Sequence, residues 1–301
     1  MIHSHAITYE YILNLNHIIN RRNLPGVNIR QLIAPLILAG TLSGASAQQA
    51  SPTQSAARPY SLDITAPVQI AASDAASKIF QTEVLPGMLD LVNKNLGEYR
   101  TQSDKELAAI SLDPSKLVLN SDATARVYFL GEGAGNRNSL GISTTGGGPL
   151  SEDAALIFPD ASSPSGYAGS RSLVRSYREP LLAGDFVDLG SFKAGTALDF
   201  FLIANGAGGG SEAFSTNLSL NKDGVVHAVS LAPNGSAYLI IGFEDLNGGG
   251  DRDYNDLVFA VEIGKNNVSQ LAGLGAPEPS LAAGCLLAAA ALFGLSRRRH
   301  T

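Results

Sequence analysis

SAYLIIGFEDLNGGGDRDYNDLVFAVEI, residues 236–263, consists of two apolar runs joined by an acidic, glycine-rich segment. Both runs are short and rich in β-branched and aromatic residues, which is typical of strands. The first run, SAYLIIGF, is nearly continuous in its apolar character, and so is ALDFFLIANG at 197–206. Because a strand with one solvated face alternates apolar and polar residues, we expect these two strands to be central and covered on both faces.

Similar short runs extend back to Leu117. They are separated by clusters of glycine, proline, asparagine and serine, without a helical pattern between them. Besides the runs quoted above, they are LVLN, ARVYFLG, SLGIS, AALIF, DFVDLGSF, TNLSL and GVVHAVSLA. This spacing predicts a mainly β domain over 117–263, an antiparallel β-sandwich of jelly-roll-like kind. The domain is long enough to bury a hydrophobic core.

A helical segment is expected ahead of this domain, within 67–116. Between Asp74 and Tyr99, apolar residues recur at spacings of three and four, namely Ile79, Val84, Leu85, Met88, Leu89, Val92 and Leu96. Pro86 and Gly87 interrupt the pattern, which predicts two helices or one kinked helix. Such an amphipathic segment either caps a sheet or docks to a partner, and capping is the commoner outcome. We expect a flexible lead over 48–66 and a linker over 264–276.

The N-terminal segment 1–47 has the order of a secretory signal peptide. A short apolar run, Leu32 to Leu42, follows Arg30 and precedes Ala45-Ser46-Ala47, so we expect cleavage after Ala47. The run is too short for a permanent membrane span. The 26 residues ahead of Val27 form an unusually long polar lead-in, and translation starting at Val27 would give a signal peptide of ordinary length.

The C-terminal segment 277–301 has three parts. Pro277-Glu278-Pro279 is followed by an apolar run from Leu281 to Leu295 and by Arg297, Arg298 and Arg299. A helix over the apolar run would span ~22 Å, less than the roughly 30 Å of hydrocarbon in a bilayer. The segment therefore suits a transient inner-membrane anchor whose arginines stay cytoplasmic, although a plain C-terminal tail anchor is the alternative.

This C-terminal segment resembles a PEP-CTERM sorting signal. The resemblance implies processing by an exosortase, a membrane protease of Gram-negative bacteria that make extracellular polysaccharide. It also implies an exported protein of the cell surface or extracellular matrix, made as a membrane-anchored precursor.

The composition of residues 48–276 excludes several classes of function. Fifteen Lys and Arg side chains face 25 Asp and Glu, which leaves a formal net charge of −10 and argues against nucleic acid as a partner. Cys285 is the only cysteine, so there is no disulfide framework. His227 is the only histidine between 48 and 276, which argues against a Cys/His zinc site.

The acidic segment between the two quoted strands is the candidate site. Its five carboxylates have one basic neighbour, Arg252, and belong to Glu244, Asp245, Asp251, Asp253 and Asp256. Crowded carboxylates repel one another unless a cation or solvent screens them, and calcium accepts six to eight oxygen ligands. Gly248-Gly249-Gly250 would let the loop curl around such an ion. We therefore predict that these five residues bind calcium, although a solvated turn, with Asp256 capping backbone donors, is the alternative.

An EF-hand is excluded despite a partial match. Asp251, Asp253 and Asn255 have the spacing of the first three ligands, and Glu262 falls at the twelfth position. However, residues 257–263 are expected to form a strand, which would place Glu262 roughly 20 Å from Asp256 at about 3.3 Å per residue.

The stretch FEDLNGGGDRDYNDLVFAVEI resembles the C-terminal signature of the DUF4114 family, and ALDFFLIANG resembles the strand that precedes it. The resemblance covers roughly Arg126 to Ile263 and leaves out 48–116. It implies a β-rich extracellular module that binds calcium, and it supplies no biochemical activity.

The leading functional hypothesis is a non-enzymatic, exported surface or exopolysaccharide-matrix protein that contacts extracellular polysaccharide or a surface protein. One alternative is a carbohydrate-binding module that uses Tyr128, Tyr167, Tyr177, Tyr238 and Tyr254, although the chain has no tryptophan. The other is a glycan-active hydrolase with a pair of acids across a cleft. His227 as the base of a serine hydrolase is disfavoured, because it lies within a strand and no GxSxG motif is present.

Overall fold

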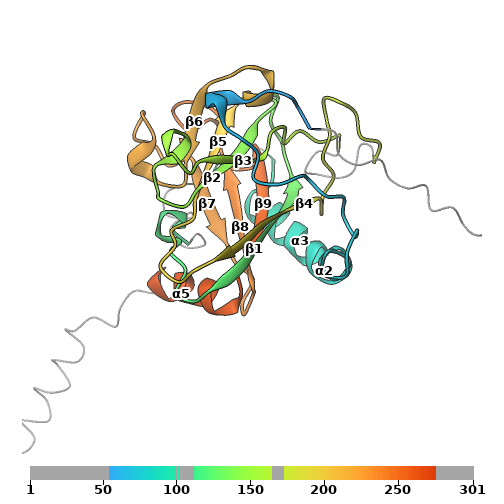
Figure 1. Ribbon diagram of the computed structural model, residues 1–301, viewed down its shortest axis with the longest axis vertical. Helices are drawn as coiled ribbons and strands as arrows, with labels where there is room; N and C mark the ends of the chain where they lie inside the picture. The colour runs from blue at the N-terminus through green and yellow to red at the C-terminus, as the bar shows by residue number, and fades with distance from the viewer. Residues whose placement is uncertain (1–53, 99–100, 102, 104–111, 165–172, 276–301) are drawn as a thin grey trace, which may run out of the picture. The chain divides into compact units, whose positions relative to one another are not determined.

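Figure 1 shows the computed structural model, which describes residues 54–98, 101, 103, 112–164 and 173–275. The described residues form nine strands and three α-helices. The strands are β1 (Ala123–Gly131), β2 (Ser139–Ser143), β3 (Ala155–Phe158), β4 (Phe186–Phe192), β5 (Asp199–Ala204), β6 (Glu212–Ser215), β7 (Ala228–Leu231), β8 (Tyr238–Phe243) and β9 (Leu257–Glu262). The helices are α2 (Ala75–Ile79), α3 (Leu85–Asn95) and α5 (Lys265–Gly275).

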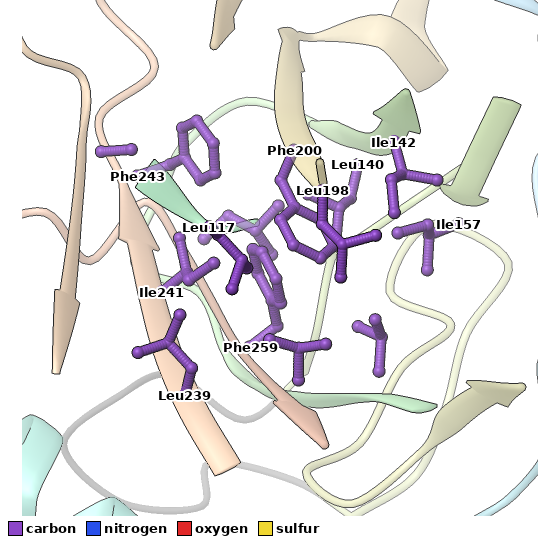
Figure 2. Close-up of a cluster of buried hydrophobic side chains, with 14 of the residues drawn as sticks. Leu117, Leu140, Ile142, Ile157, Leu198, Phe200, Leu239, Ile241, Phe243 and Phe259 are labelled. Carbon is purple, nitrogen blue, oxygen red and sulfur yellow. The ribbon is translucent and has the colours of Figure 1, made fainter. Parts of the chain in front are cut away.

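The strands form two antiparallel sheets that share one core. The larger sheet has the order β4-β1-β9-β8-β7 and the smaller one β3-β2-β5-β6. Figure 2 shows side chains of both sheets meeting between them: Leu239, Ile241 and Phe259 come from the larger sheet, and Leu140 and Phe200 from the smaller. The phenyl rings of Phe200 and Phe259 have centroids 5.1 Å apart across this interface. The expected mainly β fold is therefore confirmed as two face-to-face antiparallel sheets.

The two strands expected to be central lie inside their sheets and are covered on both faces. In β8, Leu239 and Ile241 face the shared core, whereas Ile240 packs beneath the helices. In β5, Phe200 enters the shared core, whereas Phe201 packs with Leu62 and Leu156 on the outer face. Their continuous apolar sequence thus reflects burial on both sides rather than helical packing.

The helical segment covers the outer face of the larger sheet, as the capping interpretation expected. Asp74 caps the start of α2, accepting a hydrogen bond from the Ser77 amide, while the Ser77 hydroxyl accepts one from the Asp74 amide. Between α2 and α3, residues Phe80–Val84 form a wide π-helical turn. This turn precedes Pro86, which has no amide proton to donate to a carbonyl four residues earlier. The predicted irregularity therefore falls just ahead of Pro86-Gly87.

Arg126 ties the helical segment to the larger sheet. Its guanidinium donates to Asp74 at the start of α2 over 2.9 Å and to Asp188 of β4 over 2.6 Å. It also lies 4.2 Å from the centroid of the Phe186 ring. One side chain therefore joins three elements, and only 15% of it is exposed.

Replacing Arg126 with methionine is expected to destabilise the protein by about 2 kcal/mol. The variant keeps an apolar side chain but leaves the carboxylates of Asp74 and Asp188 without their cation. Because both carboxylates are 40% exposed, the loss of stability stays below the 3–5 kcal/mol that breaking a fully buried pair costs. The urea midpoint of unfolding measures the change. Lys193→Met removes an almost fully exposed pair with Asp122 and should leave the midpoint where it is. Equal midpoints for both variants would contradict the role of Arg126.

Two of the expected strands are not strands. LVLN at 117–120 is extended but makes a single bridge, between Val118 and Ala197, while Leu117 and Leu119 enter the core. Within TNLSL, Leu218–Leu220 form a 3₁₀ turn, because the Asn217 side chain caps it by accepting a hydrogen bond from the Ser219 amide. The fourth strand of the smaller sheet is instead β6, just ahead of TNLSL, and it was not among the expected strands.

The expected linker 264–276 forms helix α5 over Lys265–Gly275. Val268 and Leu271 of this helix are buried in the shared core. The Asn267 side chain accepts hydrogen bonds from the amides of Asn120 and Ser121. Tertiary contacts therefore stabilise a helix in a segment whose composition is typical of a linker.

The expected flexible lead is attached to the smaller sheet over its described part, 54–66. Leu62 is buried against the outer face of this sheet. The Thr65 amide donates to the Leu156 carbonyl and the Leu156 amide to that of Asp63, each over 2.8 Å. These bonds cover the edge of β3, which otherwise offers unpaired backbone groups.

The signal peptide expected over 1–47, including Val27, and the sorting signal of Pro277, Glu278, Pro279, Arg297, Arg298 and Arg299 lie outside the described residues. In the described part, no helix has the length and apolar character needed to cross a membrane.

Candidate metal centre

The acidic loop 244–256 connects two neighbouring strands of the larger sheet. Phe243 at the end of β8 pairs with Leu257 at the start of β9, so the two ends of the loop lie side by side. Positive φ angles occur at Gly248, Gly249 and Gly250 and also at Arg252 (66°) and Tyr254 (57°). Left-handed backbone is costly for residues with a β-carbon, so the surrounding contacts must hold this loop in shape.

Three of the five predicted ligands converge in this loop. One carboxylate oxygen from each of Glu244, Asp251 and Asp253 lies within 4.8 Å of the others. Glu244 and Asp253 are almost fully buried, with 1% and 2% of their surface exposed, whereas Asp251 is exposed. The three oxygens therefore form a small acidic centre with one side open to solvent.

Glu244 has a buried carboxylate oxygen that can accept a further partner. Its Oε1 accepts a hydrogen bond from the Tyr254 amide over 2.8 Å. Its Oε2 is buried without a hydrogen-bond partner among the described residues. Gly250 lies directly beside Oε2, and a β-carbon at position 250 would collide with this oxygen. A buried, unpaired carboxylate oxygen is costly, so this position calls for a proton or a cation.

The electrostatics at Glu244 agree with this geometry. Burial raises the pKa of the Glu244 carboxyl from 4.5 to about 7, and the negative charges of Asp251 and Asp253 add to the rise. Near neutral pH, the carboxyl is therefore balanced between a protonated form and a charged form that needs a counter-ion. A divalent cation would favour the charged form.

The other two predicted ligands are held separately. The Asp245 carboxylate accepts hydrogen bonds from the side-chain amides of Asn136, over 3.1 Å, and Asn138, over 2.8 Å. Asp256 accepts one from the Asp245 amide over 2.8 Å. Burial, helped by the charge of Asp245, raises the pKa of Asp256 to about 8. For Asp256 the geometry is that of the alternative interpretation, because it caps a backbone donor.

Asn255 links the acidic centre to the helical segment. Its side-chain amide donates to Asp253 Oδ2 over 2.7 Å and to the Leu96 carbonyl, just beyond α3, over 3.3 Å. In the sequence, Asn255 stands out only as an EF-hand position, and Asn136 and Asn138 do not stand out at all. The two latter residues lie more than 100 positions from Asp245, and no local pattern marks them.

His227 is a structural residue. Its imidazole is buried and stacks on the Phe214 ring, with centroids 3.8 Å apart. Nε2 lies 2.8 Å from an Asp223 carboxylate oxygen, and Nδ1 lies 3.3 Å from the Glu244 carbonyl. Both ring nitrogens are thus occupied by partners other than a serine. This geometry does not provide the base of a serine hydrolase.

A pocket of about 450 Å³ lies beside β7 and is lined by His227, Arg252, Pro114, Leu218 and Val226, among others. Asp113 is the only acid among its lining residues within the described part. A glycosidase needs two carboxyl groups on opposite sides of the bond to be cleaved. This pocket therefore does not present the pair of acids that the hydrolase alternative needs.

The tyrosines do not form a binding platform on an exposed sheet face in the part of the chain that the structure describes. Tyr128 and Tyr254 are buried, and Tyr238 packs beneath the helices. Tyr177 is 71% exposed but lies in a loop, and Tyr167 is outside the described residues. Carbohydrate stacking therefore has no structural support on the sheets.

The acidic loop lies within a segment that matches a known protein family. Residues 192–264 match the family described as "Domain of unknown function (DUF4114)". The match spans β5 to β9 and includes all five acidic residues of the loop. It begins later than the expected start at Arg126, so β1 to β3 and the helical segment lie outside it. Neither a curated protein nor a solved structure matches the chain.

Proposed function

We propose that this chain is an exported, non-enzymatic protein of the cell surface or exopolysaccharide matrix whose β-sandwich is stabilised by calcium. The observation that carries the proposal is the convergence of Glu244, whose Oε2 is buried and unpaired, with Asp251 and Asp253, each offering a carboxylate oxygen within 4.8 Å of the others. A hard cation with oxygen ligands fits this donor set, because it neutralises the three carboxylates and gives the unpaired Glu244 Oε2 a partner. Asp245 and Asp256 would support the loop from outside the ligand set.

Calcium suits the proposed location outside the cell. Extracellular modules bind it with dissociation constants near 10⁻⁴–10⁻³ M, within reach of millimolar extracellular calcium. Binding to the native state alone would add ~2.7 kcal/mol of stability at a hundredfold excess over the dissociation constant. The chain would thus become fully stable after export.

The proposed location of the protein outside the cell is inferred from its terminal sequences. Residues 1–47 would direct export, and residues 277–301 would hold a precursor in the inner membrane until an exosortase processes it. Extracellular polysaccharide or a surface protein would be the partner of the mature form. N-terminal sequencing of the exported protein tests cleavage after Ala47.

Thermal unfolding of the purified protein tests the cation. We expect saturating calcium to raise the melting temperature by roughly 5–10 °C relative to chelator, and magnesium to raise it less. Asp253→Asn should lose most of this gain, because it removes a charge from the centre. Asp90→Asn makes the same charge change at an exposed position of α3 and should keep the gain.

Calorimetric titration with calcium completes the test. Uptake by the native protein and by Asp90→Asn, together with weak or absent uptake by Asp253→Asn, would support the centre. No uptake at millimolar calcium, with identical melting temperatures in calcium and chelator, would overturn the proposal.

A further inference from the structure

The acidic centre and the helical segment share one side chain. The two amide hydrogens of Asn255 are directed to two acceptors, Asp253 Oδ2 at 2.7 Å and the Leu96 carbonyl at 3.3 Å. Carbonyls at the C-terminal end of a helix lack an intrahelical partner, so such a bond satisfies an otherwise open acceptor. Asn255 therefore joins Asp253 directly to the C-terminal end of α3.

Backbone contacts around Asn255 strengthen this connection. The Asn255 carbonyl accepts a hydrogen bond from the Gly133 amide, just after β1, over 2.9 Å. Gly242 of β8 lies against both the Tyr254 carbonyl and the Leu96 side chain, and a β-carbon there would collide with that carbonyl. The loop, the end of α3 and two strands of the larger sheet thus meet at one point.

The helical segment covers an apolar surface of the larger sheet. Leu85, Met88, Val92 and Leu96 are buried against sheet residues that include Tyr128, Ile240, Val258 and Ala260. Leu96 caps the C-terminal end of α3 and is itself fully buried in this cluster. Any change that releases Leu96 would therefore loosen the cover of this apolar face.

We propose that cation binding at Glu244, Asp251 and Asp253 fastens the C-terminal end of α3 onto the larger sheet through the positioning residue Asn255. This inference rests on the proposed cation centre. Without the ion, the three carboxylates repel one another and Asp253 no longer orients Asn255. With the ion, Asp253 is fixed and Asn255 holds the Leu96 carbonyl. The centre would then control the stability of a helix that contributes no ligand to it.

Hydrogen exchange measured by mass spectrometry, on the purified protein in calcium and in chelator, tests this coupling. We expect amides over 88–96 to exchange on the order of tenfold more slowly in calcium, the effect of one additional hydrogen bond that closes the helix end. Asn255→Ala should lose this calcium-dependent protection over 88–96. Asn95→Ala is the matched control, because the Asn95 side chain donates to the Leu91 carbonyl within the same helix, and it should keep the protection.

Calcium uptake, measured by calorimetry on the same samples, separates two failures. Uptake with unchanged exchange over 88–96 in the native protein would overturn the coupling and leave the cation centre standing. No uptake at all would overturn both. The native protein alone decides between these outcomes, so the test holds even if Asn255→Ala does not fold.

Discussion

In the absence of divalent cations, the protein is expected to be more stable at pH 5 than at pH 8. Burial raises the pKa of Glu244 from 4.5 to about 7 and that of Asp256 from 3.8 to about 8. A carboxyl with a raised folded-state pKa stabilises the native state while it is protonated. This contribution is fully present below the unfolded-state pKa and is lost as the pH rises through the folded-state pKa.

The magnitude can be estimated for Glu244, which is 1% exposed. A rise in pKa from 4.5 to about 7 corresponds to roughly 3 kcal/mol of stability lost between about pH 4.5 and pH 7. Asp256 extends the loss in the same direction to higher pH. Calcium should oppose the trend, because a bound cation favours the charged carboxylates and competes with protons for them.

Urea unfolding at pH 5, 6, 7 and 8, in chelator and in calcium, measures this dependence. Glu244→Gln removes the titrating group and keeps nearly the same size, so its stability in chelator should vary less with pH than that of the native protein. It should also gain little from calcium. A native protein whose stability in chelator increases from pH 5 to pH 8 would show that Glu244 is not held in a desolvated acidic centre.

The strands that the sequence predicts best are those whose burial is visible in the residues themselves. β8 and β9 combine β-branched and aromatic residues with nearly continuous apolar character, and both lie inside the larger sheet. Helix α5 could not be found in this way, because Asn266, Asn267 and two glycines make its composition typical of a linker. It is stabilised by Val268 in the core and by the bonds of Asn267 to residues near 120, contacts that no local pattern contains.

For the acidic loop, the sequence shows how many carboxylates are present but not which of them lie close together in the fold. The density of carboxylates along 244–256 is enough to locate a candidate centre. Which of these carboxylates converge depends on the pairing of β8 with β9 and on hydrogen-bond donors that are distant in the sequence. Asn136 and Asn138 donate hydrogen bonds to Asp245, and Asp256 accepts one from the backbone at the base of the loop. The five acids are equivalent in the sequence, whereas in the fold only Glu244, Asp251 and Asp253 form the group of converging carboxylates.

Gly250→Ala is expected to abolish calcium binding, whereas Gly248→Ala is expected to preserve it. Both glycines have positive φ angles, 51° and 83°, so both substitutions carry a similar backbone strain of about 1–2 kcal/mol. Only at position 250 does the new methyl group collide with Glu244 Oε2; at position 248 no atom lies within 4 Å of it. Gly250→Ala should therefore also lose the calcium contribution of ~2.7 kcal/mol at a hundredfold excess.

Calorimetric titration and urea unfolding of the two variants, each in calcium and in chelator, measure this difference. In chelator both should be destabilised by the backbone strain, and Gly250→Ala more strongly, because its methyl group also displaces the buried Glu244 Oε2. In calcium only Gly248→Ala should recover part of its stability, since its carboxylates can still converge on the ion. If Gly250→Ala bound calcium as tightly as Gly248→Ala, the ion could not occupy the space beside Oε2. The unpaired oxygen of Glu244 would then need another explanation, with protonation as the remaining choice.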